Sequence, residues 1–205
     1  MITISTTQAE HAEAIERHQR LCFPTMLEED LITSQQVLRH LELFPEGQHV
    51  ALDGERVVGM SSTFRIGATR AFAPHSFHDI VDAGWFGHHD PQGEWLYGAD
   101  VSVHPDYRGR KISRMLYDAR KALIRRLGMR GMVAGGMLPD FHKHRATMSI
   151  EEYVSAVSAG RLSDATLTPQ LRSGFVVRGV FDNYLEAGHL GSQAALIVWQ
   201  NPDRN

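Results

Sequence analysis

The sequence has almost no cysteine, no long apolar run and no excess of positive charge. Its one cysteine among 205 residues, Cys22, excludes an intramolecular disulfide, which is typical of a reducing compartment, so we expect a cytoplasmic protein. We interpret Cys22 as a buried hydrophobic side chain, because free cysteine is usually buried. No apolar run approaches the ~20 residues that span a bilayer, and the start lacks the pattern of a signal peptide, so we expect no membrane partner.

The charge balance argues against nucleic acid as a partner. The formal net charge is -3, whereas proteins that coat nucleic acid usually carry a basic excess. We interpret the basic stripe of one predicted helix as a solvated face; it consists of Arg120, Lys121, Arg125 and Arg126. Neither His88-His89 nor His142-x-His144 has the spacing of a known metal site, so we interpret these histidines as solvated loop residues and predict no metal.

Hydrophobic periodicity predicts one mixed α/β domain over residues 1–205, without a repeat or a linker. In chain order we expect a strand at 2–4, helices over 9–21 and 28–43, a hairpin of 49–52 with 56–66, a strand over 94–103, a helix over 111–127, a strand over 131–138, a helix over 149–159, and a closing antiparallel pair of 175–184 with 194–199. In the second helix, the core candidates are Leu31, Val37, Leu38 and Leu41.

Residues 67–93 interrupt this regular pattern. Glycine, proline, histidine and aromatic residues predict a long irregular connection, and such connections are often functional. The rings of Phe72, Phe77 and Trp85 either cover a binding pocket or pack against the sheet or a second subunit, which leaves a homodimer open.

The stretch 101–117 carries the strongest chemical signal. A strand enters a turn with Pro105 and Gly109 and then a helix whose first turn holds Arg110, Lys111 and Arg114. Cations are unfavourable at a helix N-terminus unless an anion is bound there, and the free N–H groups of the first turn would bind the same anion. The residues therefore predict a phosphate-bearing cofactor, such as one with a pyrophosphate.

This stretch resembles the acyl-CoA-binding motif of the GNAT acetyltransferases, Gln/Arg-x-x-Gly-x-Gly/Ala. Arg108 takes the first place, whereas Lys111 and Ser113 replace the two small motif residues. The segment 172–175 resembles the Gly-Phe element before the last hairpin of these enzymes. The sequence around 96–100 and 175–180 is similar to GNAT domains fused to carbon–nitrogen hydrolases, although we expect no hydrolase part in this chain.

The resemblance implies the GNAT fold, in which helices flank a mixed, mostly antiparallel sheet that is splayed at the motif strand. It implies that acetyl-CoA or coenzyme A pairs with the backbone of Val101 and Val103, and that the N–H of Val101 stabilises the oxyanion of the thioester. The remaining cofactor-binding residues that it implies are Arg108, Gly109, Arg110, Lys111, Ile112, Ser113 and Arg114.

The catalytic acid and base are harder to assign. Tyr97 stands where some family members have a glutamate base. Strict alternation places Tyr97, Ala99, Val101 and Val103 on one face of the strand and Leu96, Asp100 and Ser102 on the other. A bulge would re-aim Asp100, which is then a candidate base, but a buried structural aspartate is an equal interpretation.

Gln170 occupies the position of the family's usual proton-donating tyrosine and cannot supply a proton. His142 and His144 are replacements by neighbourhood, and Tyr184 and Tyr153 are weaker ones.

Two functions follow from these observations. The first is an N-acyltransferase that uses acyl-CoA and an unidentified amine acceptor by direct attack. The second is a non-catalytic acyl-CoA sensor or interaction module that has kept the fold without its acid and base. Turnover with a panel of amines separates them.

Overall fold

The structure, a computed structural model, describes residues 1–185 and 192–204. Its centre is a seven-stranded sheet in the order β1-β2-β3-β4-β5-β7-β6. The strands are β1 Ile2–Thr6, β2 His49–Asp53, β3 Arg56–Ile66, β4 Trp95–Val103, β5 Gly131–Met137, β6 Val176–Phe181 and β7 Ala194–Gln200. β4 and β5 run parallel and every other neighbouring pair is antiparallel, which confirms the mixed, mostly antiparallel sheet.

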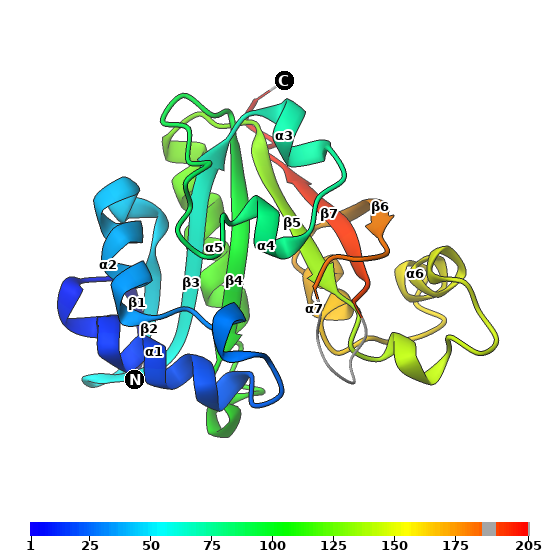
Figure 1. Cartoon of the computed structure of the whole chain (residues 1–205), viewed down its shortest axis with the longest axis horizontal. Coiled ribbons are helices and arrows are strands. Elements are labelled where there is room, and N and C mark those ends of the chain that lie inside the picture. Colours follow the sequence, from blue (N-terminus) through cyan, green and yellow to red (C-terminus); the bar gives the residue numbers. More distant parts are fainter. Residues whose placement is uncertain (186–191, 205) are drawn as a thin grey trace.

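Helices cover both faces of the sheet. They are α1 Ala12–Cys22, α2 Ser34–Leu43, α3 Ala68–Phe72, α4 Phe77–Ile80, α5 Ile112–Arg126, α6 Ile150–Ser158 and α7 Leu167–Arg172. The helices α1 and α2 pack on one face of β2 and β3, and α5 packs on the opposite face (Figure 1). α6 and α7 lie beside β5, β6 and β7 at the other end of the sheet.

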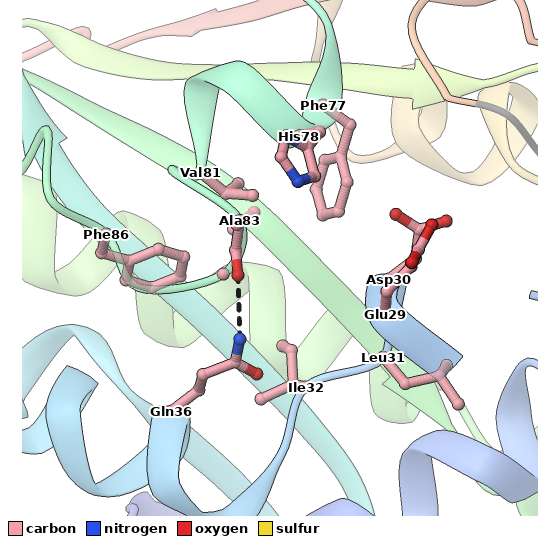
Figure 2. A pocket seen from close by; sticks show the side chains of 12 residues that line it. Glu29, Asp30, Leu31, Ile32, Gln36, Phe77, His78, Val81, Ala83 and Phe86 are labelled. Atoms are coloured by element: carbon pink, nitrogen blue, oxygen red, sulfur yellow. Dashed lines mark hydrogen bonds between the residues drawn. The ribbon is translucent and has the colours of Figure 1, made fainter. Parts of the chain in front are cut away.

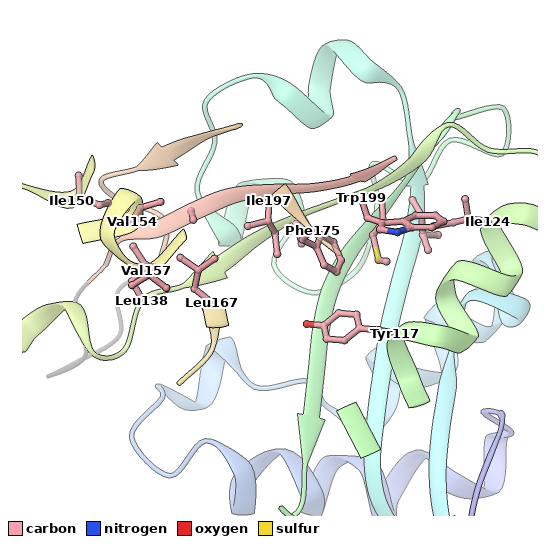
Figure 3. Packing of buried hydrophobic residues seen from close by; sticks show 14 of the residues in the cluster. Tyr117, Ile124, Leu138, Ile150, Val154, Val157, Leu167, Phe175, Ile197 and Trp199 are labelled. Atoms are coloured by element: carbon pink, nitrogen blue, oxygen red, sulfur yellow. The ribbon is translucent and has the colours of Figure 1, made fainter. Parts of the chain in front are cut away.

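The largest hydrophobic cluster joins α6 and α7 to the sheet. Phe175 packs edge-on against Tyr117 of α5, and Trp199 of β7 lies in the same cluster (Figure 3). Val154 and Val157 of α6 are buried against it. This cluster fixes α5 and α7 on the same side of β5.

The parallel pairing of β4 with β5 is short. It covers only Trp95 with Gly131, Leu96 with Met132, and Tyr97 with Val133. Beyond these pairs β5 still pairs with β7 as far as Met137, so β4 and β5 diverge. We call the gap between them the splay; it confirms the splayed sheet that the resemblance implies.

A bulge in β4 lies at the start of the splay. Ser62 of β3 is opposite Asp100, but Thr63 is opposite Gly98, so Ala99 has no partner on β3. Ala99 and Asp100 therefore point to the same face of the sheet, and the alternation inverts beyond them.

The bulge corrects the faces predicted from strict alternation. Val101 and Val103 pack towards Ile112 of α5 and do not share the face of Tyr97. Asp100 lies on the face of Tyr97, where its carboxylate meets Gln19 of α1. The expectation that a bulge would re-aim Asp100 is confirmed.

The helix predicted over 28–43 is wrong over residues 28–33. Residues Glu28–Asp30 form a single 3-10 turn, and Thr33 starts α2 as an N-cap that accepts a hydrogen bond from the Gln36 N–H. Leu38, a predicted core residue, is 42% exposed, whereas Leu31 and Val37 are buried.

The connection 67–93 is less irregular than predicted, because it contains the short helices α3 and α4. In the described part of the chain, no helix is both long and apolar enough to cross a membrane.

Candidate active site at the splay

The entry to α5 is built from two residues with left-handed backbone. Gly109 has φ of 79° and Lys111, the N-cap of α5, has φ of 63°. The family motif usually places glycine at the position of Lys111, and this φ gives the reason, since only glycine adopts it without a steric cost. Among the residues that the structure describes, no side chain caps this helix, so its first N–H groups point outward as donors.

The cations at this turn differ in their partners. The guanidinium of Arg110 lies 4.6 Å from the ring centre of Tyr107, and Arg114 pairs loosely with Asp118 at 3.9 Å. Within residues 1–185 and 192–204, Arg108 and Lys111 form no ion pair. These two exposed cations are therefore the ones available to an anion at the α5 N-terminus.

The motif strand presents a free edge to the splay. Val101 and Val103 pair with Ser61 and Gly59 of β3 on one side. On the other side, the described pairing with β5 ends at Tyr97. The edge beyond Tyr97 is therefore open to an extended ligand.

Arg120 of α5 holds the bulge in place. It is 2% exposed, and its guanidinium donates to Ser61 Oγ at 2.6 Å, to the Ser62 carbonyl at 2.9 Å and to the Asp100 carbonyl. Burial lowers the pKa of Arg120 to about 10, so the side chain stays charged at neutral pH. The interpretation of a solvated basic stripe is wrong at this residue, and Lys121 likewise donates to the Ser173 carbonyl at 2.5 Å.

A pocket opens at the splay on the face of α1 and α4. We call it the splay pocket; its lining residues are Gln19, Phe23, Met26, Asp30, Ile32, Phe77, Ala99, Asp100, Gly135, Met137, Tyr184 and Leu185. They come from α1, the α1–α2 connection, α4, both splayed strands and the β6–β7 connection. The lining is mainly apolar.

Asp100 is the acidic group on the strand side of the splay pocket. Gln19 Nε2 donates to its Oδ2 at 2.6 Å, and Ser102 Oγ donates to the same oxygen at 3.4 Å. Burial raises the pKa of Asp100, although the hydrogen bond from Gln19 and the charge of Arg120 act against it. A carboxylate of raised pKa takes up a proton more readily than an ordinary aspartate.

Cys22 and His18 are buried near Asp100 and Ser102 but do not line the splay pocket as described. Burial raises the pKa of the Cys22 thiol to about 12, in keeping with a buried hydrophobic residue and not a nucleophile. His18 Nε2 lies 3.1 Å from Ser102 Oγ, and burial lowers its pKa to about 4.

Tyr97 does not line the splay pocket but contacts a residue that does. Its ring is fully buried, and its hydroxyl lies 2.9 Å from that of Tyr184 and 2.8 Å from Nε2 of His75. Burial raises the pKa of Tyr184 to about 12 and that of Tyr97 well above its usual value.

The other candidate acids lie elsewhere. His142 is exposed beyond β5, with its Nδ1 donating to the Pro139 carbonyl at 2.6 Å, and His144 packs on Tyr153 with ring centres 5.3 Å apart. The Tyr153 hydroxyl donates to Asp164 at 2.9 Å. None of the three lines the splay pocket as described.

Gln170 of α7, at the position of the family's tyrosine, points at the splay from the α5 face. A Cβ on Gly136 of β5 would lie 2.4 Å from its Oε1. This buried oxygen has no hydrogen-bond partner among the described residues, while its Nε2 donates to Tyr117 at 3.4 Å.

A second, smaller pocket adjoins the splay pocket and shares Asp30, Ile32, Phe77 and Ala99 with it. Figure 2 shows Glu29 and Asp30 facing Phe77 and His78 across its opening. Of the three rings considered in the sequence, Phe77 lines both cavities, whereas Phe72 packs edge-on against Trp95 and Trp85 is 44% exposed.

The histidine pairs of the sequence do not gather with other ligands. Over residues 1–185 and 192–204 there is no group of three or more His, Cys, Asp or Glu side chains that could hold a metal. His89 is not a solvated loop residue, because its Nδ1 accepts from the Arg65 N–H at 3.2 Å and its ring stacks on Phe44.

A family model described as the acetyltransferase (GNAT) family matches residues 12–145, which include the bulge, the free edge of β4 and the entry to α5. The chain belongs to this family. Two proteins of Bacillus subtilis (strain 168) are similar to it in sequence. YkwB, an uncharacterized N-acetyltransferase, is 30% identical over 184 residues, which are 89% of this chain and 81% of YkwB. YhcX, a probable hydrolase, is 37% identical over 186 residues, and the match covers 90% of this chain but only 36% of YhcX.

Solved GNAT structures share the fold at low sequence identity. The loading GNAT-like domain of CurA from Lyngbya majuscula superposes with a TM-score of 0.85 at 14% identity, over all of both chains. The GphF GNAT-like decarboxylase in complex with isobutyryl-CoA gives 0.81 at 21% identity, over 97% of this chain and 99% of that one. The acetyltransferase yncA of Salmonella typhimurium with acetyl-CoA gives 0.61 at 14% identity, over 99% and 95%.

Three residues of the site carry almost no site signal in the sequence. Gln19 lies within the helix predicted over 9–21, Arg120 belongs to the predicted basic stripe, and His75 lies in the irregular connection 67–93. Their partners lie 81, 59 and 22 residues away in sequence, so no local pattern marks them. A glutamine on the apolar face of α1 is the only signal that was present.

Proposed function

We propose that the protein transfers an acyl group from an acyl-CoA thioester to an amine by direct attack of the amine on the thioester carbonyl. The observation that carries the proposal is the splay. This gap has outward N–H groups and the cations Arg108 and Lys111 near one end, and a pocket with the Asp100 carboxylate at the other. A pantetheine arm is an extended amide chain that can pair with a free strand edge.

Three parts of acyl-CoA would find partners in this chain: the pyrophosphate, the pantetheine arm and the thioester carbonyl. The first turn of α5, with Lys111 and Arg108, would hold the pyrophosphate by N–H donors and charge. The free edge at Val101 and Val103 would pair with pantetheine. The N–H of Val101 would then stabilise the negative oxygen that develops on the thioester carbonyl during attack.

Asp100 would act on the amine. An alkylamine is protonated at neutral pH and must lose a proton before it can attack. The Asp100 carboxylate first binds the ammonium by charge and then accepts its proton, which its raised pKa favours. Gln19 and Ser102 hold the carboxylate by hydrogen bonds to one oxygen, Oδ2.

Decarboxylation of a carboxyacyl-CoA is a second candidate, favoured by the higher TM-scores of the GNAT-like decarboxylase and the loading domain. The described lining of the splay pocket opposes it. This lining contains the carboxylate of Asp100 but no lysine or arginine, so it would disfavour a second carboxylate and favour a cation. We therefore place amine acylation first.

The test combines a binding and a turnover assay on the wild type and on Asp100→Asn, with Asp203→Asn, an exposed carboxylate, as the matched control. Released CoA thiol is titrated with acetyl-CoA and a panel of amines, and CoA affinity is measured by calorimetry. We expect turnover by the wild type, a loss of about 10²-fold or more in kcat for Asp100→Asn, and unchanged CoA affinity in both variants.

Two results would contradict amine acylation. CoA binding without turnover of any amine would favour the non-catalytic sensor. Conversion of malonyl-CoA to acetyl-CoA, detected by mass spectrometry, would favour decarboxylation.

A further inference from the structure

Three hydrogen-bonded side chains lead away from the splay pocket through the protein. Tyr184, from the β6–β7 connection, lines the pocket, and its hydroxyl lies 2.9 Å from that of Tyr97 on β4. The Tyr97 hydroxyl lies 2.8 Å from Nε2 of His75, which stands between α3 and α4 and is half-buried. These three hydrogen-bonded residues therefore link the splay pocket with a side chain, His75, that is partly exposed to solvent.

The donor and acceptor in each of these hydrogen bonds follow from the tautomer of His75. His75 Nδ1 lies 2.7 Å from the Ala73 carbonyl oxygen, which can only accept, so Nδ1 carries a proton. Burial lowers the pKa of His75, which keeps the ring neutral and leaves Nε2 as an acceptor. The single proton of Tyr97 therefore goes to His75, and that of Tyr184 goes to the Tyr97 oxygen.

The pocket end of the chain is held by the backbone. The Phe77 N–H donates to the Tyr184 carbonyl at 2.5 Å, and the Tyr184 N–H donates to the Ser192 carbonyl at 2.6 Å. Gly135 of β5 leaves room for the ring, because a Cβ there would lie 2.1 Å from Cζ of Tyr184. The Tyr184 hydroxyl is thus fixed beside the splayed strand.

We propose that Tyr184, Tyr97 and His75 form a proton relay that removes a proton from the reacting amine in the splay pocket. The proposal rests on the acyl transfer proposed above. It adds a task that a single carboxylate does not complete, because an ammonium loses two protons from nitrogen on its way to an amide. Asp100 takes the first before attack, and the relay takes the second.

The relay moves one proton from the adduct nitrogen to His75. Attack forms the nitrogen–carbon bond, and the positively charged nitrogen of the adduct gives a proton to the Tyr184 oxygen. Tyr184 passes its own proton to Tyr97, and Tyr97 passes its proton to Nε2 of His75, which becomes an imidazolium. The carbon–sulfur bond then breaks, and CoA leaves with the electron pair as a thiolate that takes a proton from water. Asp100 and His75 return their protons to solvent.

The surroundings of His75 suit this task. The Asp79 carboxylate at the start of α4 favours the imidazolium by charge, and the Ala73 carbonyl favours it as an acceptor. The other titratable groups facing the ring are Tyr97 and Tyr184, and the ring of Phe181 packs on it with centres 4.7 Å apart.

Turnover of acetyl-CoA with the best amine of the panel tests the relay. We expect Tyr97→Phe, Tyr184→Phe and His75→Ala each to lower kcat by about 10²-fold without a change in CoA affinity. The double variant Tyr97→Phe/Tyr184→Phe should be no slower than either single variant, because one broken link stops the whole relay. Imidazole added to the buffer should restore part of the rate of His75→Ala but none of Tyr97→Phe.

The matched control is Tyr153→Phe, which also removes a buried tyrosine hydroxyl, here bonded to Asp164 outside the pocket; it should keep the wild-type rate. An unimpaired Tyr97→Phe, losses that multiply in the double variant, or imidazole rescue of both His75→Ala and Tyr97→Phe would overturn the relay.

Nitrogen-15 NMR of histidine-labelled protein gives a second readout that needs no acceptor. We expect His75 to carry its proton on Nδ1, with an Nε2 shift that moves in Tyr97→Phe. A proton on Nε2 in the neutral ring would overturn the relay while leaving acyl transfer in place. Absence of turnover in the wild type would contradict the acyl transfer together with the relay, so the two failures are distinguishable.

Discussion

At the scale of single residues, the entry to α5 departs from the family motif at Lys111. The backbone there favours glycine, whereas the chain has a lysine. Lys111 has a left-handed backbone that favours glycine, yet its ammonium forms no ion pair in the described part of the chain. Local strain of this kind is concentrated at functional sites, where another interaction outweighs it. The proposed pyrophosphate is such an interaction.

Two substitutions separate charge from backbone at Lys111. Both Lys111→Gly and Lys111→Ala remove the ammonium, so both should raise the Kd for CoA by about 10-fold or more, in line with ~1.5–3 kcal/mol for a charge-assisted contact. Only Lys111→Gly relieves the left-handed strain of ~1 kcal/mol, so it should be the more stable of the two in urea unfolding. Equal affinity of the wild type and both variants in calorimetry would contradict the phosphate assignment.

At the scale of elements, the strands, hairpins and the helix α5 could be predicted from the sequence, because periodicity and turn residues are local. The start of α2 could not, since the acidic turn Glu28–Asp30 continues the helical pattern without a packing face. The bulge at Ala99 could be raised only as a possibility, because it depends on the register with β3. The burial of Arg120 could not be predicted either. Its acceptors are carbonyls of β3 and β4, which are distant from it in sequence.

Arg120→Met tests what holds the bulge. The substitution keeps the unbranched, apolar stem of the side chain but removes the guanidinium, which leaves the carbonyls of Ser62 and Asp100 buried without their donor. Each such group costs about 1–3 kcal/mol, so we expect the free energy of unfolding to fall by roughly 3 kcal/mol or more in urea titrations. Arg114→Met on the exposed face of the same helix should change it by less than about 0.5 kcal/mol. A loss no larger in Arg120→Met than in this control would show that the bulge holds without the guanidinium.

At the scale of the whole molecule, the order of elements and the splayed sheet agree with the sequence and its family resemblance. The composition of the splay pocket could not be predicted, because α1, the α1–α2 connection, α4, two strands and the β6–β7 connection contribute to it. Nor could the buried histidines be told from exposed ones. His18, His40 and His49 are all buried, and burial lowers the pKa of each to about 4.

These three histidines predict an acid-sensitive fold. The unfolded chain binds their protons as the pH falls through about 6.5, whereas the folded protein binds them only near pH 4. Stability is therefore present above pH 6.5 and is lost as the pH falls towards 4. Between pH 7 and 5.5 the free energy of unfolding should decrease by roughly 3 kcal/mol in urea titrations, about one third of it from each histidine.

His40→Gln provides the control for this pH dependence. His40 Nε2 donates to the Gly84 carbonyl, a bond that a glutamine amide can imitate, but glutamine does not titrate. The variant should lose about one third of the pH dependence in the same range. An unchanged slope would assign the acid sensitivity to other groups.

The two halves of the sheet, β1–β4 and β5–β7, meet through only three residue pairs. This seam is the place where the sheet can separate at the smallest loss of backbone hydrogen bonds. A pantetheine arm lying in the splay beside this seam would act as an eighth strand and hold the two halves together beyond the three pairs. Bound acyl-CoA should then slow amide hydrogen exchange at Tyr97 and Val133, the last of these pairs, as well as along the free edge of β4.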